Sequence, residues 1–156
     1  MKSILGEFEA TLDSKGRFIL PAGFKKQIPE AETGRYVIGR GFEKCLALYL
    51  EKNWDSEYEQ IEKSNQYDPN ARLFVRYFLR GASIVVPDSA GRLLITQSLK
   101  EYAELQKDIV LVAGVNKIEI WDSNKFKQLF ESFSPETYSN LAKVVMVRDN
   151  DKLKSW

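Results

Sequence analysis

The pattern Asp-Ser-x-Gly-Arg occurs twice, at Asp13–Arg17 and at Asp88–Arg92, and it holds the residues best suited to chemistry. An aspartate side chain can accept hydrogen bonds from the backbone two residues on, and glycine supplies a positive φ, so each copy predicts a tight turn. The arginine after each turn can bind phosphate oxygens or donate two hydrogen bonds to guanine. It can also pair with the aspartate of its own turn, and the sequence leaves both alternatives open. The predicted turn-forming residues are Asp13, Gly16, Asp88 and Gly91.

Positive charge is concentrated around both turns, although the formal net charge of the chain is only +1. Residues 1–29 carry five basic and three acidic residues, and residues 72–100 carry five basic and one acidic residue. A run of like charge is often no more than a solvated surface. Because the same turn motif lies in both blocks, we predict that they bind a polyanion such as double-stranded DNA. The segment 15–26 has no acidic residue, and its cations are Lys15, Arg17, Lys25 and Lys26.

The sequence offers little support for catalysis or metal binding, and no pair of its many carboxylates stands out by spacing. The sequence has no histidine, which removes the commonest general base and metal ligand. Its single cysteine, Cys45, lies in an apolar strand-like run that predicts burial, and Gly39-Arg-Gly41 is too short for a phosphate-binding loop. We therefore expect no enzymatic activity, no metal, no cofactor and no small-molecule substrate. No apolar run approaches the ~18 residues of a membrane helix, and a lone cysteine fits a reducing compartment, so we expect a cytoplasmic protein without a membrane partner.

The elements that must position these turns form an internal repeat. Residues 13–25 match residues 88–100 at an offset of 75, and residues 45–49 match 117–121 at an offset of 72. We explain the change by a three-residue deletion in the second copy, after its short helix. Matching over several elements indicates a duplication. The expected strands are 7–12, 18–20, 36–38, 45–50, 83–86, 93–95, 108–113 and 117–121, with short helices at 22–28 and 97–103.

Longer helices are expected between and after the two copies. Residues 53–63 predict an acidic amphipathic helix, and Asp68-Pro69 is typical of a helix start. Arg72, Arg76 and Arg80 then recur every four residues on one face. We interpret this stripe as forming ion pairs across a subunit interface or to the acidic segment 51–62, in preference to contacting DNA. The aromatic stripes predict core or subunit interface, and near the C-terminus they comprise Phe126, Leu129, Phe130 and Phe133, ahead of a helix starting at Ser134-Pro135.

Five stretches of the chain together resemble the MraZ family of bacterial regulators. They lie in the family's order and spacing over roughly residues 4–130, which is far more specific than one Asp-x-x-Gly-Arg motif. The stretches are Gly6–Lys25, Gly41–Leu46, Arg72–Ala82, Asp88–Arg92 and Asn116–Trp121.

The resemblance implies an α+β fold, mainly β: a duplicated swapped-hairpin β-barrel of the SpoVT-AbrB type with flanking helices. It implies repeats at 7–53 and 82–125, a helical connector at 54–81 and a C-terminal helical segment at 126–156. It also implies a cytoplasmic, nucleoid-associated homo-oligomer, a ring, that acts as a transcriptional repressor. Its targets would be repeated DNA sites upstream of the cell-division and cell-wall gene cluster. Carried over by position, the DNA-binding residues are Lys15, Arg17, Lys25, Lys26, Arg92 and Lys100.

The second copy departs from the first at two positions. Ala90 replaces the loop-tip lysine, and Thr96 stands where the first copy has Pro21. Both departures favour the first copy as the DNA reader and give the second a structural or interfacial role. The alternative function is a protein-interaction module of the same fold, as in related antitoxins, which would act through the Arg72/Arg76/Arg80 face and the C-terminal helices.

Overall fold

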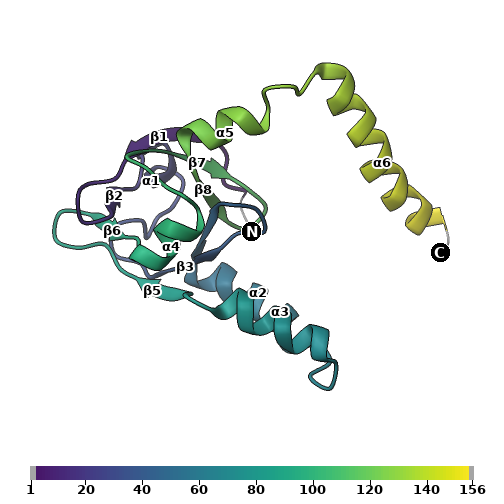
Figure 1. Cartoon of the computed structure of the whole chain (residues 1–156), viewed down its shortest axis with the longest axis horizontal. Coiled ribbons are helices and arrows are strands. Elements are labelled where there is room, and N and C mark those ends of the chain that lie inside the picture. Colours follow the sequence, from purple (N-terminus) through teal and green to yellow (C-terminus); the bar gives the residue numbers. More distant parts are fainter. Residues whose placement is uncertain (1–2, 155–156) are drawn as a thin grey trace. The chain divides into compact units, whose positions relative to one another are not determined.

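A computed structural model describes residues 3–154, with side chains described for residues 3–146. The elements of each copy follow one another in the same order, two strands, a short helix, two strands and a longer helix (Figure 1). The first copy contains β1 (Glu7–Thr11), β2 (Arg17–Ile19), α1 (Ala22–Lys25), β3 (Tyr36–Arg40), β4 (Leu46–Leu50) and α2 (Glu51–Glu62). After α3 (Pro69–Leu79), the second contains β5 (Ser83–Val85), β6 (Arg92–Leu94), α4 (Gln97–Tyr102), β7 (Asp108–Ala113), β8 (Ile118–Asp122) and α5 (Ser123–Leu129), and α6 (Pro135–Lys154) follows.

Strand pairing exchanges elements between the two copies. The larger sheet has the order β1-β7-β8-β4-β3-β5, so β1 of the first copy pairs with β7 of the second, and β5 pairs with β3. The registers are equivalent: Phe8 lies opposite Leu111, and its counterpart Ser83 lies opposite Ile38. Among the described strands, β2 pairs only with β6, in a separate two-stranded sheet that we call the ribbon. The predicted α+β class and the swapped hairpins are confirmed.

The β-barrel that the resemblance implied is not closed in the structure. β1 and β5 stand at the two edges of an open six-stranded sheet, and the ribbon shares no strand pairing with it. Each ribbon strand is only three residues long. Pro21, which follows Leu20 after β2, has no N–H to extend a ladder. The ribbon therefore packs on the sheet through side chains, without completing a barrel.

Contrary to our inference from the sequence, the three residues that the second copy lacks are not all missing from the connection after its short helix. The offset is 75 at Gly16 and Gly91, 73 at Gly41 and Gly114, and 72 at Cys45 and Lys117. Gly41 donates to the Cys45 carbonyl and Gly114 to the Lys117 carbonyl, both at 2.8 Å, so the second hairpin turn is itself one residue tighter. Only two of the three missing residues fall in the connection after the short helix.

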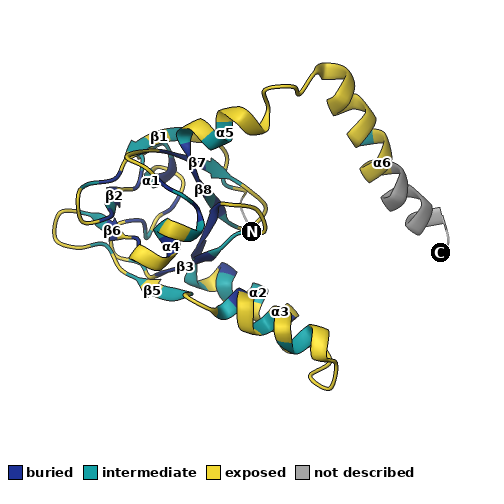
Figure 2. Cartoon of the chain, viewed as in Figure 1, coloured by how far each residue is buried: buried dark blue, intermediate teal, exposed yellow. Residues whose placement is uncertain are grey.

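Equivalent residues of the two copies fill one core between the sheet, the ribbon and the short helices. Phe18 and Leu93 are buried from the ribbon, and Phe24 and Leu99 are fully buried from α1 and α4 (Figure 2). Removing a buried aromatic ring costs about 3–5 kcal/mol in proteins of this size. The ribbon, which carries both turn motifs, is thus held in place by the packing of its inward-facing side chains in the core.

The helical hairpin of α2 and α3 covers part of the other face of the sheet. Trp54 stacks on Phe78 with ring centroids 5.8 Å apart, and Trp54 also meets Tyr49 of β4 at 5.3 Å. The predicted helix start is confirmed, because the Asp68 carboxylate accepts the Asn70 N–H at 2.9 Å. At the other end of α3, the Arg40 guanidinium donates to the Arg80 carbonyl and lies 4.7 Å from the Tyr77 ring centroid.

A second compact unit begins at Asn124 and contains α6, while the first unit ends at Ser123. Within the second unit the predicted aromatic stripe forms edge-on contacts, with centroids 5.2 Å apart for Phe126 and Phe130 and 5.5 Å for Phe130 and Phe133. Phe130 and Phe133 are 47% and 40% exposed, so a buried core does not account for them. None of the described helices is both long and apolar enough to cross a bilayer.

Candidate nucleic-acid interface

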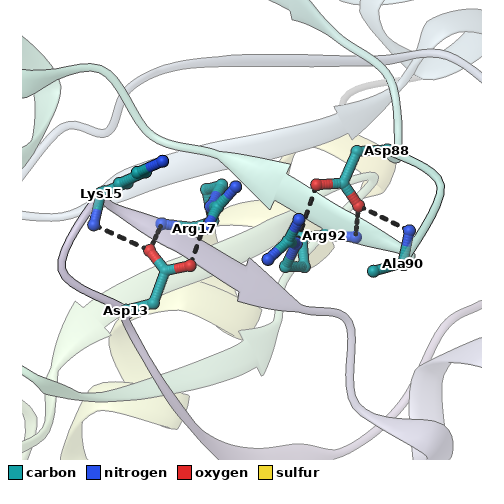
Figure 3. Close-up of polar contacts among 6 residues, drawn as sticks. All are labelled: Asp13, Lys15, Arg17, Asp88, Ala90 and Arg92. Atoms are coloured by element: carbon teal, nitrogen blue, oxygen red, sulfur yellow. Dashed lines mark hydrogen bonds and ion pairs between the residues drawn. The ribbon is translucent and has the colours of Figure 1, made fainter.

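The first turn is closed by the carboxylate of Asp13. One oxygen accepts the backbone N–H groups of Lys15 and Arg17, both at 2.9 Å, and the other accepts Nε–H of Arg17 at 2.8 Å (Figure 3). Gly16 takes a φ of +80°, which a residue with a Cβ rarely adopts. Asp13 therefore fixes the backbone of the turn and the direction of the Arg17 guanidinium at once.

The second turn repeats this arrangement. Asp88 accepts the backbone N–H groups of Ala90 and Arg92 at 2.9 Å and Nε–H of Arg92 at 2.8 Å (Figure 3). Gly91 also has a φ of +80°. Asp88 and Gly91 thus occupy the second turn as Asp13 and Gly16 occupy the first.

Hydrogen bonding also changes the acidity of the two aspartates. The backbone N–H of Arg17, together with its guanidinium and the N–H of Lys15, lowers the pKa of Asp13 below its ordinary value. The equivalent donors of Arg92 and Ala90 lower the pKa of Asp88 in the same way. Both carboxylates thus remain charged, and the turns remain closed, at neutral pH.

Antiparallel pairing places both arginines on the outward face of the ribbon. Arg17 lies opposite Leu94, and Ile19 lies opposite Arg92, so these four side chains share one face. Phe18 and Leu93 point the other way, into the core. The arginine side chains are 25% and 34% exposed, and their neighbours Ile19 and Leu94 are 50% and 46% exposed.

Each arginine pairs with the aspartate of its own turn, and this pairing does not exclude a role in binding. Within each guanidinium group, the aspartate engages only Nε. Among the described residues no other partner takes the terminal Nη groups, and these carry four of the five guanidinium donors. An oriented guanidinium with free Nη donors can bind a planar acceptor pair such as a phosphate or a guanine edge.

The predicted lysines do not form one cluster. Lys15 is exposed at the tip of the first turn, as predicted. Lys25 is half-buried, with its ammonium 3.9 Å from the Glu32 carboxylate. Lys26 is exposed and lines a separate hollow together with Glu30 and Lys52. Lys100 is half-buried in the last turn of α4.

Lys107 is a candidate that the sequence analysis missed. It lines a shallow hollow with Asp13, Arg17 and Arg92, and its carbonyl accepts the Leu12 N–H at 2.8 Å. Lys107 lies far along the chain from the first turn and outside both repeat matches. Only the pairing of β1 with β7 brings it here, so the signal was the swapped topology itself.

Comparison with known proteins gives the family of the chain. The family described as "MraZ protein, putative antitoxin-like" matches twice, over residues 4–77 and 78–149. The chain belongs to the MraZ family. The protein named "Transcriptional regulator MraZ" from Flavobacterium psychrophilum is 38% identical, and the match covers 97% of this chain and 96% of that protein.

Other MraZ proteins match almost as widely. Those of Cytophaga hutchinsonii and Halothermothrix orenii, which carry the same name, are 38% and 36% identical over 85% and 88% of this chain and 95% and 93% of their own length. Their names place these MraZ relatives in a non-enzymatic class of protein, in agreement with the prediction that this chain is not an enzyme. The double match also agrees with the duplication inferred from the turn motifs.

One further group of side chains in this MraZ chain has a spacing suited to a metal ion. Among the described residues, ligand atoms of Glu43, Cys45 and Glu119 lie within 4.8 Å of one another. Cys45 is fully buried, as predicted, and this burial, reinforced by Glu119, raises the pKa of its thiol to about 12. A cysteine binds a metal ion as its thiolate, so the environment of Cys45 opposes that role.

Proposed function

We propose that this chain is a sequence-specific, DNA-binding transcriptional repressor. The observation that carries the proposal is the outward face of the ribbon, where Arg17 and Arg92 are each held by an aspartate, with Lys15 at a neighbouring tip. By the family resemblance, its sites are repeated elements upstream of the bacterial cell-division and cell-wall gene cluster. The same resemblance supports a cytoplasmic, nucleoid-associated location.

A two-stranded ribbon is narrow enough to enter the major groove of DNA, which is about 12 Å wide. Because Asp13 and Asp88 fix Nε, each guanidinium reaches the DNA with little further loss of side-chain freedom. Terminal Nη donors can then take a guanine edge, while Lys15 and Lys107 contact the phosphates that flank the groove. The remaining predicted contacts, Lys25, Lys26 and Lys100, stand as secondary candidates outside the ribbon.

We also propose that the protein acts as a homo-oligomer, in the form of a ring. The net charge of +1 gives a single chain little attraction for DNA, and several linked ribbons would supply the missing affinity. The α2–α3 hairpin supports self-association, because Leu73, Phe74 and Tyr77 of α3 are 65%, 45% and 52% exposed. We keep the functional division into repeats 7–53 and 82–125, connector 54–81 and C-terminal segment 126–156 as part of this proposal.

The decisive experiment measures binding to the DNA just upstream of the protein's own gene by gel shift and fluorescence anisotropy. Replacing Lys15 and Arg17 by alanine should weaken binding by about 100-fold, since a base contact and a phosphate contact are lost together. The matched control replaces Lys63 and Lys143, two exposed lysines outside the ribbon, and should bind within about threefold of the native chain. Native-like binding by the Lys15/Arg17 variant, with its fold and mass unchanged, would show that this face does not hold DNA.

A protein-interaction function is the second candidate, and two observations favour it. The family description includes the words antitoxin-like, and α6 exposes Tyr138, Leu141 and Val145 along one side. Affinity purification of the native chain from its own cells separates the candidates. One stoichiometric foreign protein, without a DNA shift at low salt, would favour the interaction module.

A further inference from the structure

The ribbon has an approximate two-fold axis that passes between Phe18 and Leu93. These two residues lie opposite each other, and the flanking pairs are Arg17 with Leu94 and Ile19 with Arg92. The larger sheet repeats the symmetry, with Ala47 opposite Glu119 and equivalent pairs on both sides. The two turns are therefore equivalent by position, at opposite ends of one antiparallel ribbon.

The two turns differ in charge despite their identical hydrogen bonds. Lys15 occupies the tip of the first turn, and the uncharged Ala90 occupies the tip of the second. Lys107, whose carbonyl accepts the Leu12 N–H next to the first turn, adds a further cation to the hollow that contains Asp13, Arg17 and Arg92. One end of the ribbon thus offers more positive charge than the other.

The two turns also differ in how firmly they are held. The Gly16 carbonyl accepts the Ile95 N–H at 2.8 Å, and a Cβ added to Gly16 would come 2.8 Å from the Ile95 carbonyl oxygen. A Cβ added to Gly91 would meet nothing within 4 Å. The first turn is thus hydrogen-bonded to the residue that follows β6, whereas the equivalent glycine of the second turn faces open space.

We propose that the ribbon binds each DNA element in one preferred orientation, and that Lys15 is the residue that sets it. This inference rests on the proposed DNA-binding function. The DNA backbone looks nearly the same after rotation about a local dyad, and Arg17 and Arg92 exchange places under the ribbon's own two-fold axis. With two identical turn tips, the ribbon would therefore bind either way round. Where the two flanks of an element differ in shape, the charged first turn removes this degeneracy, because only one orientation places Lys15 against the better-positioned phosphate.

Affinity cleavage can read the orientation directly. Ser14 and Ser89 are exposed, equivalent residues of the two turns, so Ser14→Cys and Ser89→Cys can each carry an iron chelate that cuts nearby DNA. Cys45 is fully buried and does not compete for the label. The probe is the DNA upstream of the protein's own gene, cut down to one element protected in a hydroxyl-radical footprint. The two labels should cut opposite flanks of this element, each favouring its own flank at least about threefold, the effect of one phosphate contact.

Two variants then test the role of Lys15, each carrying the same two labels. Lys15→Ala removes the difference in charge between the tips and should make both labels cut both flanks far more equally, at reduced affinity. Ala90→Lys adds the missing charge and should also equalise the flanks, at increased affinity. Comparable loss of preference with opposite changes in affinity is the expected signature.

The outcomes separate this inference from the function on which it rests. Equal cutting of both flanks by the native chain, with a clear footprint, would overturn the preferred orientation and leave DNA binding intact. Native preference in Lys15→Ala would overturn the assignment to Lys15. A missing footprint for the native chain would instead refute the proposed function.

Discussion

Two pairs of arginines differ in whether a carboxylate holds their side chains. On the ribbon, Arg17 and Arg92 each pair at 2.8 Å with an aspartate four residues earlier. Arg76 of α3 and Arg80, which caps that helix, are exposed, and no ion pair joins them to an acidic residue in the described part of the chain. The difference indicates two roles. The paired arginines are positioned for a ligand of fixed geometry, and the unpaired arginines are available to another subunit.

The largest expected effect is the difference in DNA affinity between a variant that lacks the ribbon arginines and one that lacks Arg76 and Arg80. Arg17→Ala with Arg92→Ala should weaken binding to a single DNA element by about 100-fold or more, because two base contacts are lost. Arg76→Ala with Arg80→Ala removes the same charge and should stay within about threefold. Anisotropy titrations at one salt concentration make the measurement, and equal losses would show that total charge alone matters.

Charge reversal on the hairpin should give the next largest effect, on assembly. Arg76→Glu should lower the mass measured by light scattering, and Glu59→Arg on α2 should act similarly if α2 of one subunit meets α3 of the next. Combining both should restore the native mass, since the opposite charges face each other again. An unchanged mass in both single variants would place the subunit interface elsewhere.

Removing the aspartates tests positioning against charge. Asp13→Asn with Asp88→Asn makes the chain more positive, which by itself favours DNA, but it leaves both guanidinium groups without a carboxylate partner. We expect affinity for the specific element to fall by about tenfold and affinity for unrelated DNA to rise slightly. Tighter specific binding would identify the aspartates as competitors of DNA.

The smallest effect concerns acid stability. The folded pKa values of Asp13 and Asp88 are lowered, so their contribution to stability is complete above the unfolded value of about 3.9 and is lost as pH falls through the folded values. Urea unfolding of the native chain should therefore weaken more below about pH 4 than that of the Asp13→Asn, Asp88→Asn variant. Identical pH dependence would mean that the two carboxylates do not stabilise the folded turns.

Local chemistry predicted much of this molecule. Asp13 and Gly16 encode the turn in adjacent residues, and the Asp68-Pro69 helix start is equally local, so both could be predicted directly. The position of Lys107 beside the first turn depends on the pairing of β1 with β7, which no short window of sequence contains.

The interpretation of the α3 stripe shows the same boundary. The pattern predicted one face carrying Arg72, Arg76 and Arg80, and it offered the acidic segment 51–62 as one partner. Within the described chain no ion pair joins that segment to the stripe, and α2 and α3 meet through Trp54 and Phe78. Arg72 instead donates to the Gln66 carbonyl at 2.9 Å. Helix periodicity fixes which residues share a face and leaves open which neighbouring face they meet.

The exchange of β1 and β5 between the copies has a consequence for inheritance. In a dimer of two identical single-hairpin chains, one codon specifies both ends of the ribbon, and every substitution appears twice. Here Lys15 and Ala90 occupy equivalent places but have separate codons. A mutation can therefore alter one end of the ribbon and leave the equivalent residue at the other end unchanged. The covalent duplication thus allows the two halves of the site to evolve independently.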